Sequence, residues 1–471
     1  MATNRRSILR RLARHWLVVA ALAILPTHVW ADSDVFPCVI GDQFFNTSGF
    51  FNYGMVGGIH AFSLEVKACN QGDTFANWIE ETNQHPVITQ NLLRLRNGRF
   101  EQIGQAWLKH GFFVAAEDGC TLCSGEEDFT KLGPGCCDTY GASLNGFQSI
   151  LGPKSEVNAS TGVFPYPFCG GGCPAAGNGI DRRLQVADAD LDINQTVIYI
   201  TEMQYVLQDD CQANPRTDYN NASYRRIGIN SSKQMSFWLS ATMPGEPGIN
   251  AWAAYEAGVT SGVVDVPGDG RFHVSAKATD LGGGTWHYEY AVQNLNSDRS
   301  GASFSVPIPI GATISNVGFH DIFYHSGEPY DPTDWSMPAN GVTTGNALTW
   351  ASQAYLIDPP NANALRWGTL YNFRFDANVP PDTGVATIGL FKPGSPTTAS
   401  LGTVTPRFCV CTGDLNGDGK LDGLDVPAFV QAYLGITPTN CADVASPSGS
   451  TPDDADLAQV VSLLLGTGTC P

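Results

Sequence analysis

Apolar and polar residues alternate strictly along three segments in the second half of the chain, at 271–278, 286–292 and 371–377. A period of two places every second side chain on one face of a strand, which is the pattern of a half-buried antiparallel sheet. Glycine, proline and asparagine separate these segments. The pattern therefore predicts a β-sandwich over residues 265–405.

The first half of the chain is less regular, but it contains one sharp turn signal. The Asn-Gly dipeptide at 97–98 lies between two apolar segments and favours the two-residue turn of a β-hairpin. Such a turn pairs Arg94 with Glu101 and Leu95 with Phe100.

The segment 197–206 is predicted to be an apolar strand that carries Glu202 on the same face as its isoleucines. A carboxylate in that place is either paired, for example with Arg182 or Arg183, or it has a raised pKa, and pairing is the favoured interpretation. In the second case Glu202 would serve as a general acid. His110, which is polar amid apolar neighbours, is the other weak catalytic candidate.

Several polar patterns have an ordinary structural interpretation beside a functional one. The alternating oxygen donors at 188–194 fit a calcium loop or, preferably, a solvated acidic turn. His273 and His287 fall on the polar faces of their strands and are interpreted as solvated positions. Three tryptophans would line a sugar-binding groove or, more commonly, belong to the core: Trp335, Trp350 and Trp367.

The composition supports a strand-rich fold. The 471 residues include 51 glycines and 29 prolines, and only 15% of them are charged. An average domain has about 25% charged residues and about 12% glycine plus proline. This balance favours strands joined by many turns over long surface helices.

The first 31 residues are predicted to be a secretory signal peptide. Five arginines precede an apolar stretch at 16–26, and small or aliphatic residues precede Asp32. The pair Arg5-Arg6 fits a twin-arginine signal as well as an ordinary basic head. The apolar stretch is shorter than the roughly 20 residues of a membrane span, and no later segment is long enough, so no transmembrane span is expected.

Removal of the signal peptide leaves 21 basic residues against 45 acidic residues. Because phosphate binding needs a basic surface, this excess of acid disfavours a nucleic acid partner. We expect a secreted protein that is extracellular or held at the cell surface.

All 13 cysteines follow the expected cleavage site, so every thiol reaches an oxidising compartment and disulfides are predicted. The spacing of Cys120, Cys123, Cys136 and Cys137 also suits a four-thiolate zinc site, which is the less favoured interpretation. The loop 169–173 is expected to be closed by a bridge. An odd count leaves one thiol without a partner inside the chain.

An acidic loop near the carboxy terminus has the spacing of a calcium site. In residues 414–425, oxygen-bearing side chains hold positions one, three, five, nine and twelve, and glycine holds position six. Calcium takes about six to eight oxygen ligands, and position seven offers its backbone carbonyl. The predicted metal ligands are Asp414, Asn416, Asp418, Lys420, Asp422 and Asp425.

The loop ends in Asp425, where the general EF-hand loop has glutamate, and a helix follows at 426–434 although none precedes. Asp456 closes a second segment of the same kind before another helix. The pattern resembles a type I dockerin, a duplicated half-EF-hand unit, over residues 409–471. The resemblance implies that the two helices pack together through matching apolar faces: Phe429, Val430, Tyr433 and Leu434 on one, Val460, Val461, Leu464 and Leu465 on the other.

The second loop departs from the family pattern. It has two residues too many, and Ala445 and Pro447 stand where oxygen ligands are expected. In the first loop, Gly423-Leu424 replaces the serine or threonine pair that commonly contacts the partner in dockerins. Three residues remain as weaker ligands: Asp443, Asp453 and Asp456.

Dockerins attach secreted cargo to cohesin-like scaffold proteins, and that cargo most often acts on polysaccharides. The resemblance thus implies calcium as the cofactor, a cohesin-like scaffold or the cell surface as the partner, and extracellular polysaccharide binding or breakdown, including glycoside hydrolysis, as the role. The alternative is a non-catalytic structural or adhesion protein of the cell surface.

The sequence thus predicts a mainly β fold with four parts. The signal peptide at 1–31 precedes a disulfide-containing β-rich region at 32–264. The β-sandwich at 265–405 and a small α-helical dockerin-like module at 409–471 follow.

Overall fold

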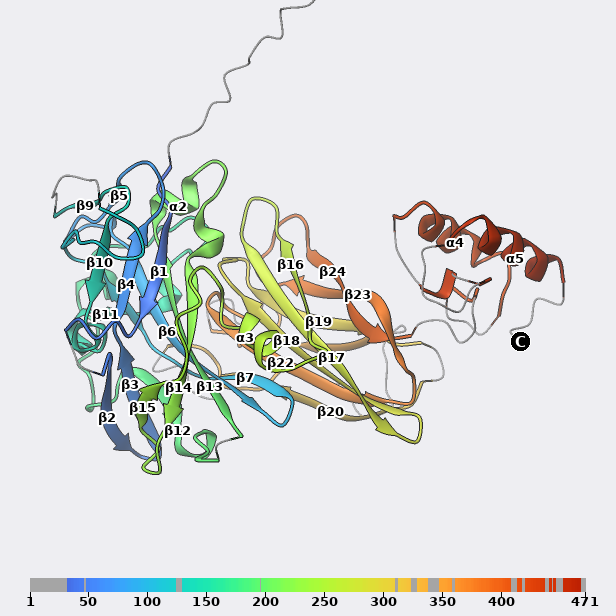
Figure 1. The fold of residues 1–471 in the computed structure, drawn as a ribbon, viewed down its shortest axis with the longest axis horizontal. Helices are drawn as coiled ribbons and strands as arrows, with labels where there is room; N and C mark the ends of the chain where they lie inside the picture. Colours follow the sequence, from blue (N-terminus) through green and yellow to red (C-terminus); the bar gives the residue numbers. More distant parts are fainter. Residues whose placement is uncertain are drawn as a thin grey trace, which may run out of the picture. The chain divides into compact units, whose positions relative to one another are not determined.

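The computed structural model shows a mainly β protein (Figure 1). The predicted signal peptide at 1–31 lies outside the residues that the structure describes. The described residues are 32–45, 48–123, 129–194, 196–309, 312–322, 328–337, 347–357, 361–407, 413–416, 420–436, 440–442, 444–445 and 452–466.

A ten-stranded sheet organises the first half of the described chain. Its main path runs β15-β14-β13-β6-β7-β12-β3-β2, while β8 pairs with both β6 and β11. Its strands are β2 (Phe50–Val56), β3 (Ile59–Leu64), β6 (Val87–Arg96), β7 (Arg99–Gln105), β8 (Leu108–His110), β11 (Leu151–Gly152), β12 (Leu184–Ala187), β13 (Ile198–Val206), β14 (Ala222–Ile229) and β15 (Met235–Trp238).

Two smaller sheets and several short helices accompany the large sheet. The three-stranded sheet has the order β1-β4-β10, and β5 pairs with β9. The strands are β1 (Val35–Ile40), β4 (Val66–Asn70), β5 (Ala76–Asn77), β9 (Lys131–Leu132) and β10 (Cys137–Tyr140). The helical elements are α1 (Ala142–Asn145), η1 (Gln148–Ile150), η2 (Lys154–Glu156), η3 (Phe168–Gly171), η4 (Asp188–Asp190), α2 (Gln208–Gln212), η5 (Asp218–Asn220) and α3 (Asn250–Tyr255).

The hairpin predicted at 97–98 is confirmed. Strands β6 and β7 pair in the expected register, with Arg94 opposite Glu101 and Leu95 opposite Phe100. Asn97 has a φ of 54° and Gly98 a φ of 81°, as a type I′ turn requires at its two central residues.

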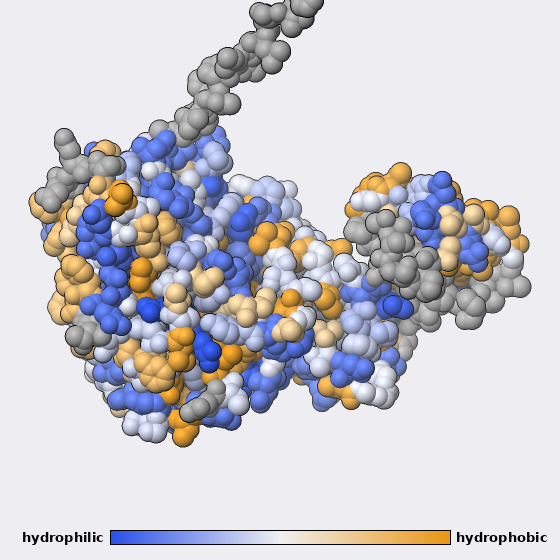
Figure 2. All heavy atoms as spheres, viewed as in Figure 1, coloured by the Kyte–Doolittle hydropathy of each residue, from blue (hydrophilic) through white to orange (hydrophobic). Residues whose placement is uncertain are grey.

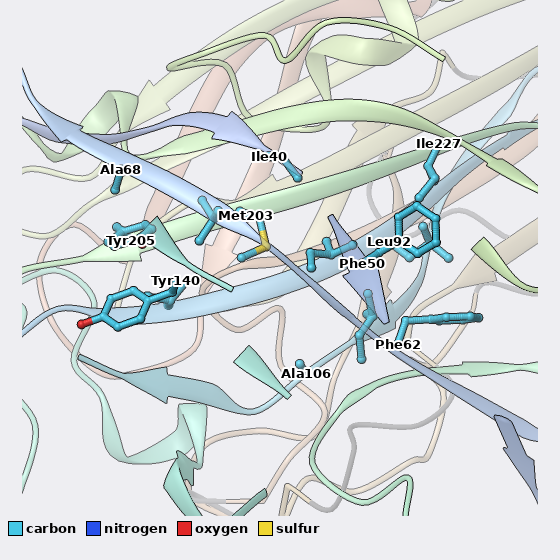
Figure 3. Close-up of a cluster of buried hydrophobic side chains, with 14 of the residues drawn as sticks. Ile40, Phe50, Phe62, Ala68, Leu92, Ala106, Tyr140, Met203, Tyr205 and Ile227 are labelled. Carbon is cyan, nitrogen blue, oxygen red and sulfur yellow. The ribbon is translucent and has the colours of Figure 1, made fainter. Parts of the chain in front are cut away.

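An apolar core joins the three-stranded sheet to one face of the ten-stranded sheet (Figure 3). Ile40 and Ala68 come from the small sheet, whereas Phe62, Leu92 and Met203 come from the large one, and none is more than 1% exposed. Full burial of a large apolar side chain contributes about 1.5–3 kcal/mol. This cluster therefore holds the two sheets together.

The second half contains the predicted sandwich. A five-stranded sheet of order β16-β17-β18-β22-β20 faces a four-stranded sheet of order β21-β19-β23-β24. Phe272 and Tyr290 of the first sheet pack with Phe304 and Trp350 of the second. The strands are β16 (Thr260–Asp265), β17 (Arg271–Gly282), β18 (Thr285–Asn294), β19 (Gly301–Pro307), β20 (Ile314–His320), β21 (Ala347–Ala351), β22 (Thr369–Ala377), β23 (Pro381–Leu390) and β24 (Thr398–Pro406).

The alternation seen in the sequence matches this sheet, but its polar positions are not all solvated. His273 is only 8% exposed, so its interpretation as a solvated residue is wrong. The outer face of the five-stranded sheet contacts the large sheet: Asn372 donates to the Phe100 carbonyl, and the Leu370 amide donates to the Gln102 side chain. Polar side chains close to these contacts are therefore covered by protein.

Four disulfides link described cysteines. Three of them fasten the loops around the three-stranded sheet, and the fourth closes the predicted small loop: Cys38–Cys120, Cys69–Cys137, Cys123–Cys136 and Cys169–Cys173. The four cysteines considered as zinc ligands are thus all in bridges. Cys211 is a free thiol and is buried. These bridges are consistent with an extracellular protein.

The carboxy-terminal part contains α4 (Val426–Tyr433), η6 (Asn440–Ala442) and α5 (Asp454–Leu465). Phe429 and Val460 are buried between these elements. The predicted faces are confirmed for these two residues, and Tyr433 and Leu464 also pack against the buried cluster, but the prediction is wrong for the other half of the set. Four of the residues expected inside are exposed: Val430, Leu434, Val461 and Leu465. Among the described residues, no helix has the length and apolarity that a membrane crossing needs.

Candidate functional site

The carboxylate of Asp425 closes the first acidic loop. Its Oδ1 accepts the Leu415 and Asn416 amides at 2.8 and 3.0 Å, and its Oδ2 accepts the Asp422 amide at 2.8 Å. Asp425 is also the residue that directly precedes α4. The chain therefore wraps around this carboxylate before it enters the helix.

Asp456 repeats this arrangement at the start of α5. Its Oδ1 accepts the Ala445 amide at 2.7 Å, and its Oδ2 accepts the Asp453 amide at 2.8 Å. Asp453 in turn accepts the Ala455 and Asp456 amides, which completes a capping box. The two halves of this part of the chain thus share one hydrogen-bond pattern.

The two loops differ in length between these matching bonds. Asp425 accepts the Leu415 and Asn416 amides, which lie ten and nine residues before it, whereas Asp456 accepts the Ala445 amide, which lies eleven residues before it. Leu415 and Val444 pack against the same buried cluster, so the loops begin in equivalent places. Because the extra residues fall inside the second loop, its oxygen donors are out of the spacing that a calcium ion needs.

The first loop has the donor set for a divalent cation. Asp414 is fully buried and Asp425 is 2% exposed, which places two carboxylates in one short loop away from water. Burial of like charges is costly unless hydrogen bonds, such as those that Asp425 accepts, or a cation compensate it. Asn416, Lys420 and Asp422 are also described in this loop, whereas the predicted ligands Asp418 and Asp443 lie outside the described residues.

The exposed apolar residues of this part form two matching stripes. Val426, Val430 and Leu434 are 38%, 45% and 62% exposed and follow one another at intervals of one helical turn. On α5 the corresponding stripe consists of Leu457, Val461 and Leu465, at 40%, 46% and 83% exposure. Figure 2 shows apolar surface on the part of the chain that carries these two helices.

Glu202 is fully buried, and its partners are not the predicted ones. Its carboxylate accepts from the Asn91 amide group at 2.8 Å, the Gln293 amide group at 2.7 Å and the Gly248 backbone at 2.5 Å. The pairing with Arg182 or Arg183 is therefore wrong. These neutral donors join the large sheet to β18, and no solvent reaches the carboxylate.

His110 is also enclosed. Its Nδ1 lies 2.9 Å from Nε2 of His85, and its ring stacks on Phe168 with the centroids 4.3 Å apart. Burial, together with the charges of His85 and Lys109, lowers the pKa of His110 to about 2. The imidazole is neutral at physiological pH, which makes it unsuited to general acid catalysis.

The alternating acids at 188–194 are neither a calcium loop nor a merely solvated turn. Asp188 pairs with His60 at 2.9 Å and with Lys233 at 2.7 Å, while Asp190 pairs with Arg94 at 3.1 Å. Basic side chains thus occupy the places around these carboxylates that a metal ion would need.

A polar cluster on the sandwich was missed by the sequence reasoning. His287 lies between Asp376, at 2.6 Å from its Nδ1, and Glu289, at 2.7 Å from its Nε2. These bonds raise the pKa of the imidazole. The cross-strand pairing of His287 with Asp376 would have revealed the cluster, had the register of β18 and β22 been known. Because both ring nitrogens are engaged, His287 has no free nitrogen for base catalysis.

Three of the cavities that described residues line have volumes of about 630, 190 and 510 Å³. The second contains Asp209 and the third contains Asp192, and the first has no carboxylate in its lining. None of the three brings together the two carboxylates that glycoside hydrolysis normally uses. The three tryptophans considered for a sugar groove are at most 4% exposed and belong to the core: Trp335, Trp350 and Trp367.

Neither a known protein family nor a curated protein sequence matches the chain. Two solved structures that resemble it are complexes of variants of the Amycolatopsis orientalis exo-chitosanase with PNP-β-D-glucosamine. In both cases the identity is 10%, the match covers 73% of this chain and 25% of the other, and the TM-score is 0.16. The chain thus spans about a quarter of the length of those proteins, and similarity at this level supports no argument about function.

Proposed function

We propose that the chain is an exported, calcium-binding protein whose carboxy-terminal dockerin-like module attaches a β-rich body to a cohesin-like scaffold protein or to a cell surface. The observation that carries this proposal is the repeated geometry of Asp425 and Asp456. Each carboxylate accepts backbone amides on both oxygens at the start of a helix. A duplicated loop-and-helix unit of this kind supports the resemblance stated from the sequence.

Calcium is the cofactor that fits the first loop. Asp414, Asn416, Asp422 and Asp425 would supply side-chain oxygens together with Asp418, and Lys420 would supply its carbonyl. The ion would neutralise carboxylates in a segment, 409–471, that has eight acidic residues against one basic residue. In the second loop of the module, capping of α5 is enough to explain the presence of Asp453 and Asp456. We therefore propose one strong calcium site and one weak calcium site.

The partner would contact the two apolar stripes. Both stripes are presented by helices that the loops orient, so calcium binding and attachment would be coupled. Leu424, which is 68% exposed, extends the apolar surface at a position where dockerins commonly carry serine or threonine. The matching face of the partner would therefore be apolar.

For the body, we favour polysaccharide binding over breakdown. Glu202 and His110 are enclosed, and the described cavities contain no pair of carboxylates. A glycoside hydrolase and a purely structural adhesion protein are the two alternatives. A polysaccharide array on the full chain separates these possibilities. Binding without reducing-end release supports our proposal, and release supports a hydrolase. The absence of both binding and release supports the adhesion protein.

Attachment is tested by binding of the full chain to a panel of type I cohesin domains. We expect binding in calcium, loss of binding in EGTA, and loss in the double variant Val430→Asp with Val461→Asp. The matched control is Val263→Asp, which alters an exposed valine of β16. Binding that persists unchanged in EGTA would contradict the proposal.

A further inference from the structure

The cavity of about 630 Å³ lies beside the disulfide-closed loop 169–173. Its volume is within the range of about 300–1,000 Å³ that is common for ligand sites. The residues around it come from 147–149, 166–176 and 182–183, so three neighbouring segments of the chain meet there. This cavity has no part in the attachment module.

Aromatic rings form one component of the lining. Phe147 is 55% exposed and Tyr166 is 37% exposed, and Phe168 is partly exposed. Exposed aromatic rings of this kind offer flat apolar surfaces on which the C–H face of a sugar ring can stack. Phe168 is held in place from behind by its stacking on the enclosed His110.

Two guanidinium groups form the second component. Arg182 donates to the carbonyl oxygens of Gln148 and Pro174, and Arg183 donates to that of Gly146 at 2.8 Å. Burial lowers the pKa of both arginines, and the nearby charge of Asp181 offsets this only in part for Arg182.

The acidic residues near the loop are used to hold its backbone. Glu156 accepts the Cys169 amide at 2.9 Å, and Asp181 accepts the Asn178 amide at 3.1 Å. Tyr166 also lines the cavity, and burial together with the charges of Glu81 and Glu80 raises its pKa. A negative ligand group would therefore lie near the arginines and away from Tyr166.

We propose that this cavity binds an acidic oligosaccharide, with a uronic acid carboxylate on Arg182 and Arg183 and a sugar ring on the aromatic wall. Arginine is the side chain best suited to a carboxylate because its planar fork can donate two parallel hydrogen bonds. The mature chain is strongly acidic, with 45 acidic against 21 basic residues, so an anionic sugar would be repelled over most of the surface. This inference deepens the polysaccharide role proposed for the body and does not depend on the calcium module.

The test is titration calorimetry of the full chain with trigalacturonate at low salt, with the methyl ester of the same trisaccharide and inorganic phosphate as comparison ligands. EGTA is present throughout, so that calcium bridging between carboxylates does not contribute. We expect trigalacturonate to bind at least about tenfold more tightly than the ester, because a hydrogen bond to a charged group is worth roughly 1.4 kcal/mol or more. Affinity should also fall as salt is added.

Variants locate the site. Arg183→Gln alters a partly exposed residue and is expected to weaken binding about tenfold. Phe147→Ala alters a largely exposed residue and is expected to weaken binding several-fold. Arg182→Gln is expected to have the largest effect, and its circular dichroism spectrum checks that it remains folded. The matched control is Arg226→Gln, which alters a half-buried arginine in the cavity of about 510 Å³.

Equal binding of acid and ester, or no effect of Arg183→Gln and Phe147→Ala, overturns the inference. Binding of phosphate as tight as that of trigalacturonate also overturns it, since the site would then be a small-anion site. If neutral polysaccharides bind the array while trigalacturonate does not bind, the proposed role of the body stands and only the ligand class is wrong.

Discussion

Asp425 and Asp456 accept backbone amides with both carboxylate oxygens, the first directly before α4 and the second in the first turn of α5. The two residues therefore organise the two halves of the carboxy-terminal module in the same way. They differ in what surrounds them, because only the loop before Asp425 keeps oxygen donors at calcium spacing.

Because the two loops differ, the same substitution at Asp425 and at Asp456 should affect calcium binding unequally. Asp425→Asn is expected to remove the strong calcium site in a calorimetric titration, whereas Asp456→Asn is expected to retain it. A ligand at 100 times its dissociation constant stabilises the folded state by about 2.7 kcal/mol, so calcium should raise the melting temperature of the wild-type module. Melting that is the same in calcium and in EGTA would show that the loop is not a calcium site.

Glu202→Gln should weaken the body without altering its binding. Glutamine places a donor against the donors of Asn91, Gln293 or Gly248, so we expect a loss of about 1–3 kcal/mol in the free energy of unfolding. Urea denaturation measures this loss. Glu256→Gln, at a carboxylate with 20% side-chain exposure, is the control and should cost less than about 1 kcal/mol. If the Glu202 variant kept normal stability but no longer bound sugars or released them, Glu202 would have a functional role and not a structural one.

The ion pair between Arg94 and Glu101 should be the costliest to break. The atoms Nη2 and Oε2 lie 2.6 Å apart, and the side chains are 2% and 4% exposed. Arg94→Ala leaves the buried Glu101 carboxylate with the more distant and more exposed Arg99, at 3.8 Å, so we expect a loss of about 3–5 kcal/mol in denaturant unfolding. The more exposed pair Arg271–Asp265 provides the comparison, and Arg271→Ala should cost about 0–1 kcal/mol. Similar losses in both variants would refute the role of burial.

His287 and His273 should give opposite dependences of stability on pH. Bonds to Glu289 and Asp376 raise the pKa of His287 above 6.5, so its stabilising contribution is complete below pH 6.5 and is lost as the pH rises through the raised value. Burial lowers the pKa of His273 to about 4, so its contribution is present above pH 6.5 and is lost as the pH falls through about 4.

Melting temperatures recorded between pH 4 and pH 9 test this pair of effects. His287→Gln should reduce the loss of stability on the alkaline side, and His273→Gln should reduce the loss on the acidic side. If both variants keep the wild-type profile, other groups set the pH dependence.

Local patterns predicted much of this fold. The turn at 97–98 set the register of its hairpin because only two residues separate the paired strands. Alternation located the strands around Phe272, Tyr290 and Phe373, since the two faces of a sandwich strand differ in polarity. The bridge between Cys169 and Cys173 also followed from spacing alone.

Long-range contacts account for the errors. Glu202 is bonded to residues that lie 111 and 91 positions away, and local sequence contains no sign of them. His273 looked solvated because the packing of α3 against its strand cannot be read from alternation. Val430 and Leu434 looked buried because an apolar helix face has the same pattern whether its own chain or a partner covers it.

The layer that joins the large sheet to the sandwich has a consequence for how the protein can evolve. Asn91 and Gln293, from different sheets, both bond to the one carboxylate of Glu202. A recombination event that paired this sandwich with a foreign sheet would leave that carboxylate and its donors unmatched in a dry interface. The two halves of the body are therefore expected to be inherited together, while the terminal module, with a core of its own, is free to be exchanged.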